Sequence, residues 1–517
     1  MKTLTLTALA AASAVTAASA AAPSPDKPNV ILILADDLGW TDLGCFGSDL
    51  YETPHLDRLA REGMRFTQAY AACPVCSPTR AAVLTGMYPA RLRVTDWIPG
   101  RTPHNPKLTI PKWTKHLPLE SVTLAERFRE AGYLTASIGK WHLGLEPYYP
   151  EKQGFDINIA GTKAGNPADG YFAPYKIPTL PEGPEGEYLT DRIGAEAVRF
   201  VGENCGRRFF LYLPHFAVHT PIQAREELTR KYEKKIKPGL RHTNARYAAM
   251  IESMDTAIGA LRAALKKHGL ADNTVIIFAS DNGGHLPTTD NSPLRAGKGS
   301  ACEGGVRVPL IIYWPGRTKP GSESDTPTVS TDFFPTLLEI AGLPARDGQG
   351  GDGVSLVPEL RGTGKISRDT ICWHYPHYQL YQKNGATPFG AIRSGDYRLV
   401  KFYDDMRVEL YNLRDDIGET RDLAKSEPAI VARLRDRLHA WRKSVGAQMP
   451  APNPDYDSSK PEQFPGKKNR RPMEPYEYLL LRSRQILVGR SRRDRREHHE
   501  ANDGSLGETA LPKLAAA

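Results

Sequence analysis

The sequence predicts an α/β protein in which helices sandwich a mixed, mostly parallel sheet, followed by a smaller C-terminal α+β domain with an antiparallel sheet and a helix. Apolar runs of strand length alternate with longer helix-like stretches from Asn29 onward. After about residue 365 the runs become shorter and follow one another closely, as antiparallel strands do. A chain of 517 residues with 40% hydrophobic and 25% charged residues is long enough for both domains.

Four apolar runs are expected to form the parallel part of the sheet. They are NVILILA (29–35), LTASIG (134–139), FFLYLP (209–214) and TVIIFAS (274–280), and VPLIIYWP (308–315) is a further strand candidate. Helices are predicted over 122–131, 191–203 and 243–265. In the C-terminal domain, 390–405 and 408–413 predict antiparallel strands, and a helix is expected near 427–446.

The first twenty residues predict a secretory signal peptide. Lys2 precedes an apolar, alanine-rich stretch that ends in the small residues Ala18, Ser19 and Ala20. A lone membrane anchor is the alternative, but the run is short and carries threonine and serine. We therefore expect an exported protein, periplasmic or secreted, without an integral membrane segment. Its expected parts are 1–20 (signal peptide), 28–365 (main domain), 366–450 (C-terminal subdomain) and 451–517 (basic, flexible tail).

The formal net charge of +9 is concentrated near the C-terminus. Residues 467–496 carry eleven Lys or Arg against three acidic residues, a net charge of +8, so the remainder is nearly neutral. This distribution argues against nucleic-acid binding by the protein as a whole. The basic run is typical of a solvated tail, and the alternative is an anchor for extracellular polyanions. Six cysteines are too few for a disulfide scaffold at this length, and no pairing follows from the sequence.

Polar residues follow each of the four predicted parallel strands. They are Asp36 and Asp37 after the first strand, Lys140 and His142 after the second, His215 and His219 after the third, and Asp281 and Asn282 after the fourth. Each group alone has an ordinary explanation as a helix cap, a polar loop or a turn. Because α/β proteins bind ligands at the carboxyl ends of parallel strands, we expect the four groups to form one site.

The residue types at this edge indicate a hard cation next to an oxyanion. The expected oxygen ligands are Asp36, Asp37, Asp281 and Asn282. Such a set favours Ca²⁺ or Mg²⁺ over Zn²⁺ or copper. The basic side chains expected around it are Arg80, Lys140, His142, His219 and Lys298. A divalent cation ringed by basic groups suits a tetrahedral oxyanion such as sulfate or phosphate.

The stretch CPVCSPTR has two interpretations. Cys73 and Cys76 have the C-x-x-C spacing of a redox dithiol. Ser77 is expected to cap a helix that has Pro78 as its first residue and ends at Gly86, so Cys76 would lie at a helix N-terminus. That position suits an anion as well as a redox thiol. A dithiol needs no oxygen-rich site, yet a thiolate is a poor ligand for a hard cation, so the residue types alone leave the role of Cys76 open.

Taken together, the motifs resemble those of the formylglycine-dependent sulfatases, which belong to the alkaline-phosphatase-like superfamily, and bacterial polysaccharide sulfatases in particular. The matching blocks are NVILILADDLGW, CSPTRAAVLTG (76–86), GKWHLG (139–144), HTP (219–221), SDNGG and GKGSACEGGVRVP, in that order. The resemblance covers about residues 28–450 and makes 28–365 the expected catalytic domain. The tail beyond about 455 has no recognised counterpart.

The resemblance implies that a formylglycine-generating maturation enzyme oxidises Cys76 to formylglycine (3-oxoalanine), with Cys73 a bystander. An oxygen of the formylglycine hydrate then replaces sulfur at the cation. The implied ligands of one Ca²⁺ are Asp36, Asp37, Asp281, Asn282 and the residue formed from Cys76.

The resemblance also implies a division of catalytic work. One hydroxyl of the hydrate attacks sulfur, and Arg80 and Lys140 stabilise the hydrate and the sulfate. His219 and Lys298 bind sulfate and protonate the leaving oxygen. His142 takes a proton from the second hydroxyl, so that sulfate is eliminated and the aldehyde returns.

Two loops are expected to recognise the substrate. The loop RVTDWIPGR would bring Asp96, Trp97 and Arg101 to the mouth of the site, and WHYPHYQLYQ would offer His374 and His377 to sugar hydroxyls. The alternative is that these side chains pack the interface between the domains. An exported sulfatase with such loops resembles bacterial enzymes that desulfate polysaccharides, and this resemblance implies galactose-type sugars as the substrate.

Two rival functions remain at the level of the sequence. A phosphate or phosphonate monoester hydrolase could share the fold and the basic ring, although phosphatases of this fold carry Ser or Thr where this chain has Cys76. A non-catalytic binder of sulfated glycans would act through the basic tail and would tolerate loss of Cys76.

Overall fold

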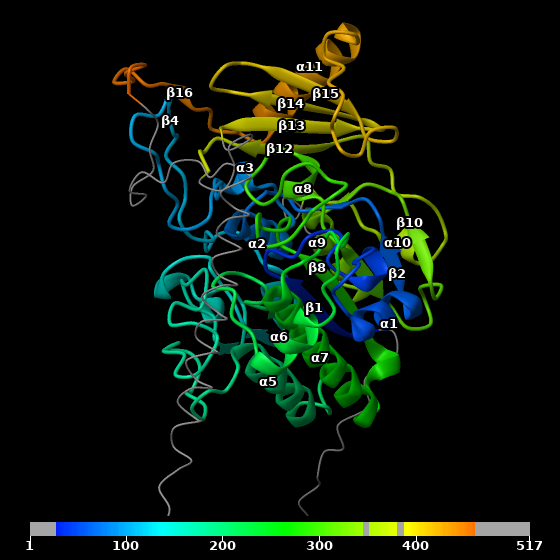
Figure 1. The fold of residues 1–517 in the computed structure, drawn as a ribbon. Helices are drawn as coiled ribbons and strands as arrows, with labels where there is room; N and C mark the ends of the chain where they lie inside the picture. The colour runs from blue at the N-terminus through cyan, green and yellow to red at the C-terminus, as the bar shows by residue number, and fades with distance from the viewer. Residues whose placement is uncertain (1–26, 345–350, 380–386, 461–517) are drawn as a thin grey trace, which may run out of the picture. The chain divides into compact units, whose positions relative to one another are not determined.

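An eight-stranded mixed sheet lies at the centre of the computed structural model, which describes residues 27–344, 351–379 and 387–460 (Figure 1). Its strand order is β10-β2-β9-β8-β1-β7-β5-β6. The strands are β1 (Asn29–Ala35), β2 (Met64–Phe66), β5 (Leu134–Ile138), β6 (Ile157–Ile159), β7 (Phe209–Pro214), β8 (Thr274–Ser280), β9 (Leu310–Tyr313) and β10 (Ser322–Ser324). The predicted signal peptide and the basic run at 467–496 lie outside the described residues.

The four predicted parallel strands are confirmed as neighbours in one parallel block. β1 pairs with β7 on one side and β8 on the other, so Ile31 lies opposite both Leu211 and Ile276, and β5 continues the block beyond β7. β9, at the predicted further strand, runs antiparallel to β8 and makes the sheet mixed. Every residue of β1, β7 and β8 is buried, which explains why their sequences are continuously apolar.

Helices cover both faces of this sheet because successive side chains of a strand point to opposite faces. Ile31 and Ile33 pack under one layer, and Val30 and Leu32 pack under the other. The first layer consists of α1 (Pro54–Glu62), α5 (Leu189–Glu203), α6 (Glu226–Glu233) and α7 (Ala245–Lys267). The second consists of α2 (Cys76–Thr85), α4 (Leu124–Glu130), α9 (Phe333–Ile340) and α10 (Val357–Leu360).

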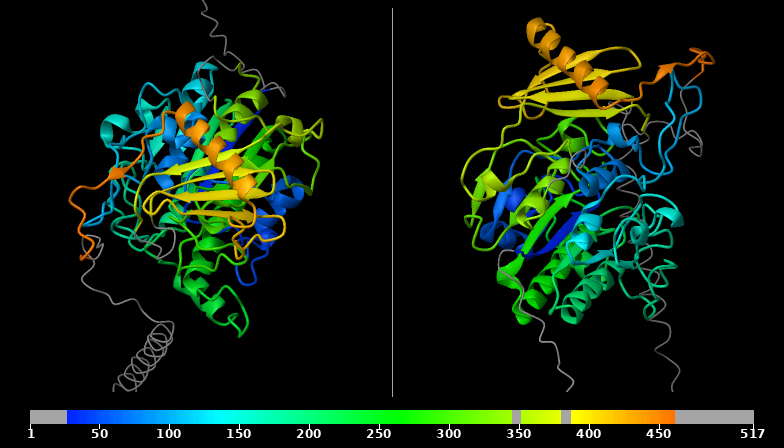
Figure 2. Two further views of the ribbon diagram at one scale, coloured as in Figure 1. Left: turned by 90° about the horizontal axis from the view of Figure 1, so that it is seen from above. Right: turned by 180° about the vertical axis from the view of Figure 1, so that it is seen from behind.

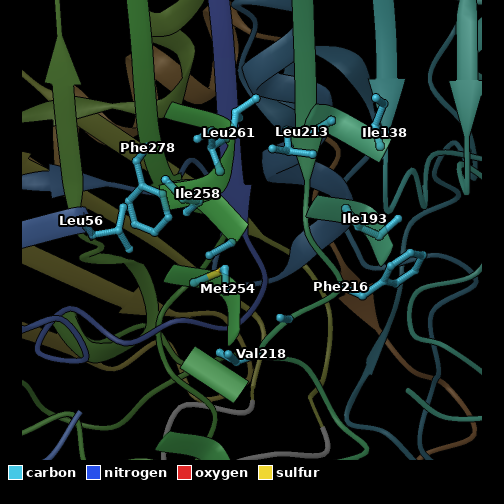
Figure 3. Close-up of a cluster of buried hydrophobic side chains, with 14 of the residues drawn as sticks. Leu56, Ile138, Ile193, Leu213, Phe216, Val218, Met254, Ile258, Leu261 and Phe278 are labelled. Atoms are coloured by element: carbon cyan, nitrogen blue, oxygen red, sulfur yellow. The ribbon is translucent and has the colours of Figure 1, made fainter. Parts of the chain in front are cut away.

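The three predicted helices are confirmed as α4, α5 and α7, each within two residues of its expected start and end. A capping box between Thr123 and Glu126 starts α4, and the Asn244 side chain caps α7. Figure 3 shows Met254, Ile258 and Leu261 of α7 in the buried cluster. Their spacing of four and three residues keeps them on one helix face.

Shorter elements connect these layers. They are α3 (Pro89–Leu92), α8 (Glu303–Val306), β3 (Ala69–Tyr70), β4 (Leu108–Thr109), β11 (Thr328–Val329), β16 (Ala451–Pro452) and the 3₁₀ turns η1 (Gly44–Phe46), η2 (Glu146–Tyr148), η3 (Pro150–Lys152), η4 (Ala271–Asn273) and η5 (Ser330–Asp332). β16 pairs with β4, so the chain just beyond residue 450 returns to the loop that follows α3. Within the described ranges, no helix is long and apolar enough to cross a membrane.

The C-terminal antiparallel sheet and its helix are confirmed. The strands β12 (Ile371–Tyr375), β13 (Phe389–Ser394), β14 (Tyr397–Phe402) and β15 (Val408–Asn412) pair in sequence order. The helix α11 (Pro428–Ser444) lies across this sheet and buries Leu434 and Leu438 against it (Figure 2). β12 was not predicted, because it is buried on both faces: Cys372 faces the α11 cluster and Trp373 faces the main domain, so its sequence lacks polar alternation.

Arg398 of β14 joins the C-terminal sheet to the segment after β8. Its guanidinium donates to Glu419 at 2.7 Å and to the carbonyl of Ala301 at 2.5 Å, and it lies 3.5 Å from a carboxylate oxygen of Glu303. The side chains of the arginine and both glutamates are 0% exposed. Removing the guanidinium would therefore leave two carboxylates buried without this cation.

We predict that Arg398→Met lowers the free energy of unfolding by about 3–5 kcal/mol, because an unpaired buried charge costs that much. Denaturant unfolding followed by fluorescence measures the change. Arg407→Met is the matched control: Arg407 pairs with Asp405 at 3.0 Å on the surface with 47% of its side chain exposed, so its loss should cost less than about 1 kcal/mol. Equal effects of the two changes would contradict this account of the interface.

Candidate active site

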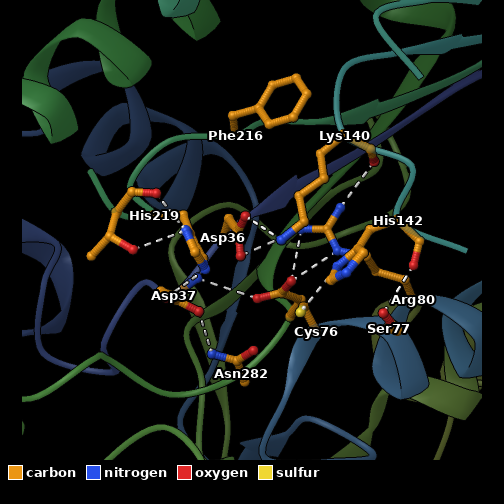
Figure 4. Close-up of polar contacts among 12 residues, drawn as sticks. Asp36, Asp37, Cys76, Ser77, Arg80, Lys140, His142, Phe216, His219 and Asn282 are labelled. Carbon is orange, nitrogen blue, oxygen red and sulfur yellow. Dashed lines mark hydrogen bonds and ion pairs between the residues drawn. The ribbon is translucent and has the colours of Figure 1, made fainter. Parts of the chain in front are cut away.

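The carboxyl ends of β1, β5, β7 and β8 bring their polar residues to one place (Figure 4). Asp36 and Asp37 follow β1, Lys140 and His142 follow β5, His219 follows β7, and Asp281 and Asn282 follow β8. Cys76 and Arg80 reach the same place from the first turn and a half of α2, and Lys298 comes from the loop after β8. The expected convergence of these residues is therefore present.

Three buried carboxylates pair with three buried cations at this centre. The pairs are Asp36 with Lys140 Nζ at 2.6 Å, Asp281 with Arg80 Nη2 at 2.7 Å, and Asp37 with Lys298 Nζ at 2.8 Å. Each of these side chains is at most 4% exposed. The formal charges cancel, which makes burial of all six groups sustainable.

Asp36 and Asp37 differ in how well their charge is compensated. Burial raises the pKa of Asp36 to about 8, although Lys140 and Arg80 oppose the rise. Burial also opposes ionisation of Asp37, but Lys298 and His219 outweigh it and hold the pKa of that carboxyl below its ordinary value. Asp36 therefore needs additional positive charge to be ionised at neutral pH.

Two buried oxygens of the predicted ligand set have no hydrogen-bond donor among the described residues: Oδ1 of Asp36 and Oδ1 of Asn282. The nearest guanidinium nitrogen, Nη2 of Arg80, lies 3.8 Å from the first of them, beyond hydrogen-bond distance. Potential ligand atoms of Asp36, Asp37 and His219 lie within 4.8 Å of one another. Unshared oxygen lone pairs beside an incompletely compensated carboxylate fit a hard cation such as Ca²⁺.

Cys76 is the first residue of α2, so the helix begins two positions earlier than the predicted start at Pro78. The prediction that Ser77 caps the helix is wrong: its hydroxyl donates to the carbonyl of His142 at 2.9 Å and accepts the N–H of Ile98 at 3.1 Å. These distant partners take the hydroxyl away from the helix start. The predicted helix end is confirmed, since Gly86 has φ of 70°, the left-handed conformation that glycine adopts readily.

His142 faces Cys76 with an unprotonated nitrogen. Nε2 of His142 lies 2.5 Å from the carbonyl oxygen of Ile98, which only accepts hydrogen bonds, so this nitrogen carries the proton. Nδ1 then presents its lone pair to Sγ of Cys76 at 3.3 Å. Burial and the nearby Lys140 hold the pKa of His142 well below its ordinary value, which keeps the ring neutral. A neutral imidazole at this distance can accept a proton from residue 76.

His219 and Lys298 lie on the opposite side of the centre. Nδ1 of His219 is 2.7 Å from the carbonyl of Thr220, and Nε2 is 3.6 Å from Oδ2 of Asp37. Burial and Lys298 hold the pKa of His219 well below its ordinary value. The neutral ring therefore carries its proton on Nδ1, bonded to the Thr220 carbonyl, and its Nε2 has no proton to donate.

A cavity of about 700 Å³ opens above this centre. Cys76, His142, His219 and Lys298 are among its lining residues, together with Trp97 and Arg101 from the predicted recognition loop. Lys115, Leu145, Lys163 and Asn166 also line it, and the sequence analysis did not single them out. They lie in irregular loops without a motif, so the sequence carried no signal for them.

None of the other three predicted recognition residues lines the cavity: Asp96 and His377 lie in the interface between the two domains, and His374 lies inside the C-terminal domain. Asp96 accepts hydrogen bonds from the Tyr375 hydroxyl at 2.5 Å and from the N–H of Trp97 at 2.8 Å. His377 bonds to Thr95 Oγ1 at 2.9 Å. The ring nitrogens of His374 lie 2.9 Å from the Tyr403 hydroxyl and 2.9 Å from the Gln448 carbonyl. Asp96 and His377 therefore pack the interface between the domains, the alternative that the sequence left open, whereas His374 packs inside the C-terminal domain.

The centre is buried, charge-balanced and rich in oxygen ligands, and it lies at the carboxyl edge of an α/β sheet. It opens to a cavity with cationic walls. These features are those of a hydrolase for esters of tetrahedral oxyanions. The family described as Sulfatase matches residues 28–343, and the C-terminal region of N-sulphoglucosamine sulphohydrolase matches residues 298–444. The chain belongs to the sulfatase family and is a sulfuric ester hydrolase.

Known proteins resemble the chain over most of its length. A sulfatase of Formosa agariphila is 36% identical over 492 residues, which cover 80% of this chain and 88% of the relative. The N-acetylgalactosamine-6-sulfatase of Canis lupus familiaris is 34% identical over 68% of this chain and 69% of its own length. The crystal structure of Ps i-CgsB in complex with k-i-k-neocarrahexaose has a TM-score of 0.69 at 31% identity, covering 84% of this chain and 96% of that chain.

We predict that His374→Leu lowers the free energy of unfolding by about 1–3 kcal/mol, because it removes two buried hydrogen bonds. The KM for a sulfate ester should change by less than about twofold, since an imidazole packed inside the C-terminal domain and away from the cavity makes no substrate contact. Thermal denaturation and steady-state kinetics on one preparation measure both effects. A large rise in KM at unchanged stability would instead assign His374 to the substrate site.

Proposed function

We propose that the protein hydrolyses sulfate monoesters on a galactose-type sugar of a polysaccharide, with formylglycine derived from Cys76 and one Ca²⁺ at the acidic cluster. The observation that carries the proposal is the 3.3 Å approach of Cys76 Sγ to the unprotonated Nδ1 of His142 at the floor of the cavity. The galactosamine-6-sulfatase relative and the neocarrahexaose complex of a structural neighbour support a sulfated saccharide as substrate.

A formylglycine hydrate at position 76 would supply a nucleophilic hydroxyl and a second hydroxyl whose deprotonation releases sulfate. Bound Ca²⁺, held by oxygens of Asp36, Asp37, Asp281 and Asn282, would supply positive charge that favours the ionised nucleophile. Nδ1 of His142 would accept the proton of the second hydroxyl, because its lone pair faces that residue and Ile98 fixes the tautomer.

The cations of the centre would orient the sulfate group. Arg80 is fixed by Asp281 and by the carbonyl of Lys140 at 3.1 Å, so its guanidinium cannot turn away from residue 76. Lys298 and His219, which line the cavity, would bind sulfate oxygens and pass a proton to the departing sugar oxygen. Since the neutral ring of His219 holds its proton on Nδ1 against the Thr220 carbonyl, we assign the proton to Nζ of Lys298.

We also propose a domain organisation and a location for the protein. Residues 28–365 would carry the chemistry and residues 366–450 would brace the recognition loops. The basic tail would begin later than the predicted residue 451, because Ala451–Pro452 pair with β4. The predicted signal peptide favours action in the periplasm or outside the cell, where polysaccharides are degraded.

The proposal predicts an aldehyde at residue 76 after co-expression with a formylglycine-generating enzyme. A mass spectrum of the tryptic peptide 66–80 after thiol alkylation measures this directly. The peptide contains Cys73 and Cys76, so the first serves as an internal control for the second. We expect alkylation at Cys73 alone. Alkylation of both cysteines despite the maturation enzyme would contradict the assigned nucleophile.

The proposal also predicts that Ca²⁺ stabilises the matured protein. At free Ca²⁺ about a hundredfold above its Kd, the gain should be about 2.7 kcal/mol, and chelation should remove it. Asp37→Asn should abolish the calcium-dependent rise in melting temperature, because it removes one charged ligand. Asp255→Asn is the control: this carboxylate accepts the N–H groups of His55 and Leu56 at 3.0 and 2.7 Å, away from the cluster. It should lower stability and preserve the calcium response.

A further inference from the structure

The outer part of the cavity is lined by three cations that the reaction centre does not use. They are Arg101, Lys115 and Lys163, and each is exposed to solvent. They come from three separate loops, after α3, before α4 and after β6. Among the described residues that line the cavity there is no aspartate or glutamate. The described side chains of this part of the wall therefore carry positive charge and no negative charge.

These three cations differ from those of the reaction centre in their partners. Lys140, Arg80 and Lys298 each face a carboxylate within hydrogen-bond distance. Over the ranges that the structure describes, none of the three outer cations has a carboxylate oxygen within 4.0 Å. Their positive charge is thus left for a ligand.

Two of the outer cations lie over aromatic rings. The guanidinium carbon of Arg101 lies 5.8 Å from the centre of the Trp97 ring, and Nζ of Lys115 lies 5.5 Å from that of Trp113. Such contacts position a cation and leave its N–H donors free to bind an anion. Lys115 also acts electrostatically on Asp96, but that carboxylate is buried, bonded to Tyr375 and absent from the cavity wall.

The cavity also offers surface to the uncharged parts of a saccharide. The ring of Trp97 and the exposed side chain of Leu145 lie on its wall, and Asn166 adds an amide. A volume of about 700 Å³ exceeds what one sulfate group at the floor would fill. A saccharide that extends from the floor through this volume would pass the outer cations.

We propose that Arg101, Lys115 and Lys163 form a second anion subsite, which binds a further sulfate or carboxylate group of the saccharide whose sulfate ester is hydrolysed at the floor. The preferred substrate is then an oligosaccharide with at least two anionic groups. This inference rests on the proposed function and adds the charge pattern that selects the substrate. It differs from the sulfate-binding floor, where every cation is already paired.

The subsite is tested by binding, without turnover. The probes are a galactose disaccharide with one sulfate and the same disaccharide with two, titrated calorimetrically into the Cys76→Ala protein loaded with Ca²⁺. We expect the disulfated probe to bind at least about tenfold more tightly. Two or three exposed contacts between the outer cations and the second sulfate group together provide an affinity gain of that size. The triple change Arg101→Gln, Lys115→Gln and Lys163→Gln should reduce this preference to less than about twofold.

The matched control removes the same charge elsewhere. Lys112→Gln, Lys152→Gln and Lys237→Gln replace three exposed lysines that do not line the cavity, and should preserve the preference for the disulfated probe. Equal binding of the two probes, or equal effects of both triple changes, would overturn the subsite. Sulfate release by the matured wild-type protein is measured in parallel. Its absence would overturn the proposed function, while a cation-dependent preference in binding would still support the subsite.

Discussion

The three ion pairs beneath the cavity are the interaction on which the rest of the structure depends. Burying six charged groups costs several kcal/mol for each ion unless every one finds a partner. The partners meet because four parallel strands end at one edge and α2 starts beside it. The set is neutral when all three carboxylates are ionised, so a bound divalent cation, which favours ionisation of Asp36, would make the centre positive and ready for an anionic ester.

The C-terminal antiparallel sheet, β12 to β15, holds segments of this centre in place although it lies outside it. Arg398 of β14 holds the carbonyl of Ala301, three residues beyond Lys298, and Tyr375 of β12 holds Asp96. Asp96 in turn binds the N–H of Trp97, whose neighbour Ile98 fixes the tautomer of His142. The C-terminal sheet thus positions both a cation and the proposed base. It does so from a distance, since neither Tyr375 nor Asp96 lines the cavity.

Much of this arrangement could be predicted from the sequence. Continuous apolar runs identified the buried parallel strands. The polar residues directly after these strands lie at one edge because parallel strands all end at the same edge of a sheet. Contacts between distant loops left no such pattern. The role of Ser77 depends on Ile98 and His142, and the burial of His374 depends on Gln448. Lys115 and Lys163 join the cavity through irregular loops, where no periodicity exists to identify them.

The central claim is that a sulfate ester is cleaved at residue 76 with His142 as the base. The most direct measurement is ion-chromatographic detection of sulfate released from a sulfated galactose oligosaccharide by the matured protein and by its His142→Ala variant. We predict sulfate release by the wild type and a rate about 10²–10⁴-fold lower in the variant, the usual contribution of a general base. Equal rates, or faster cleavage of the matching phosphate ester, would contradict the account.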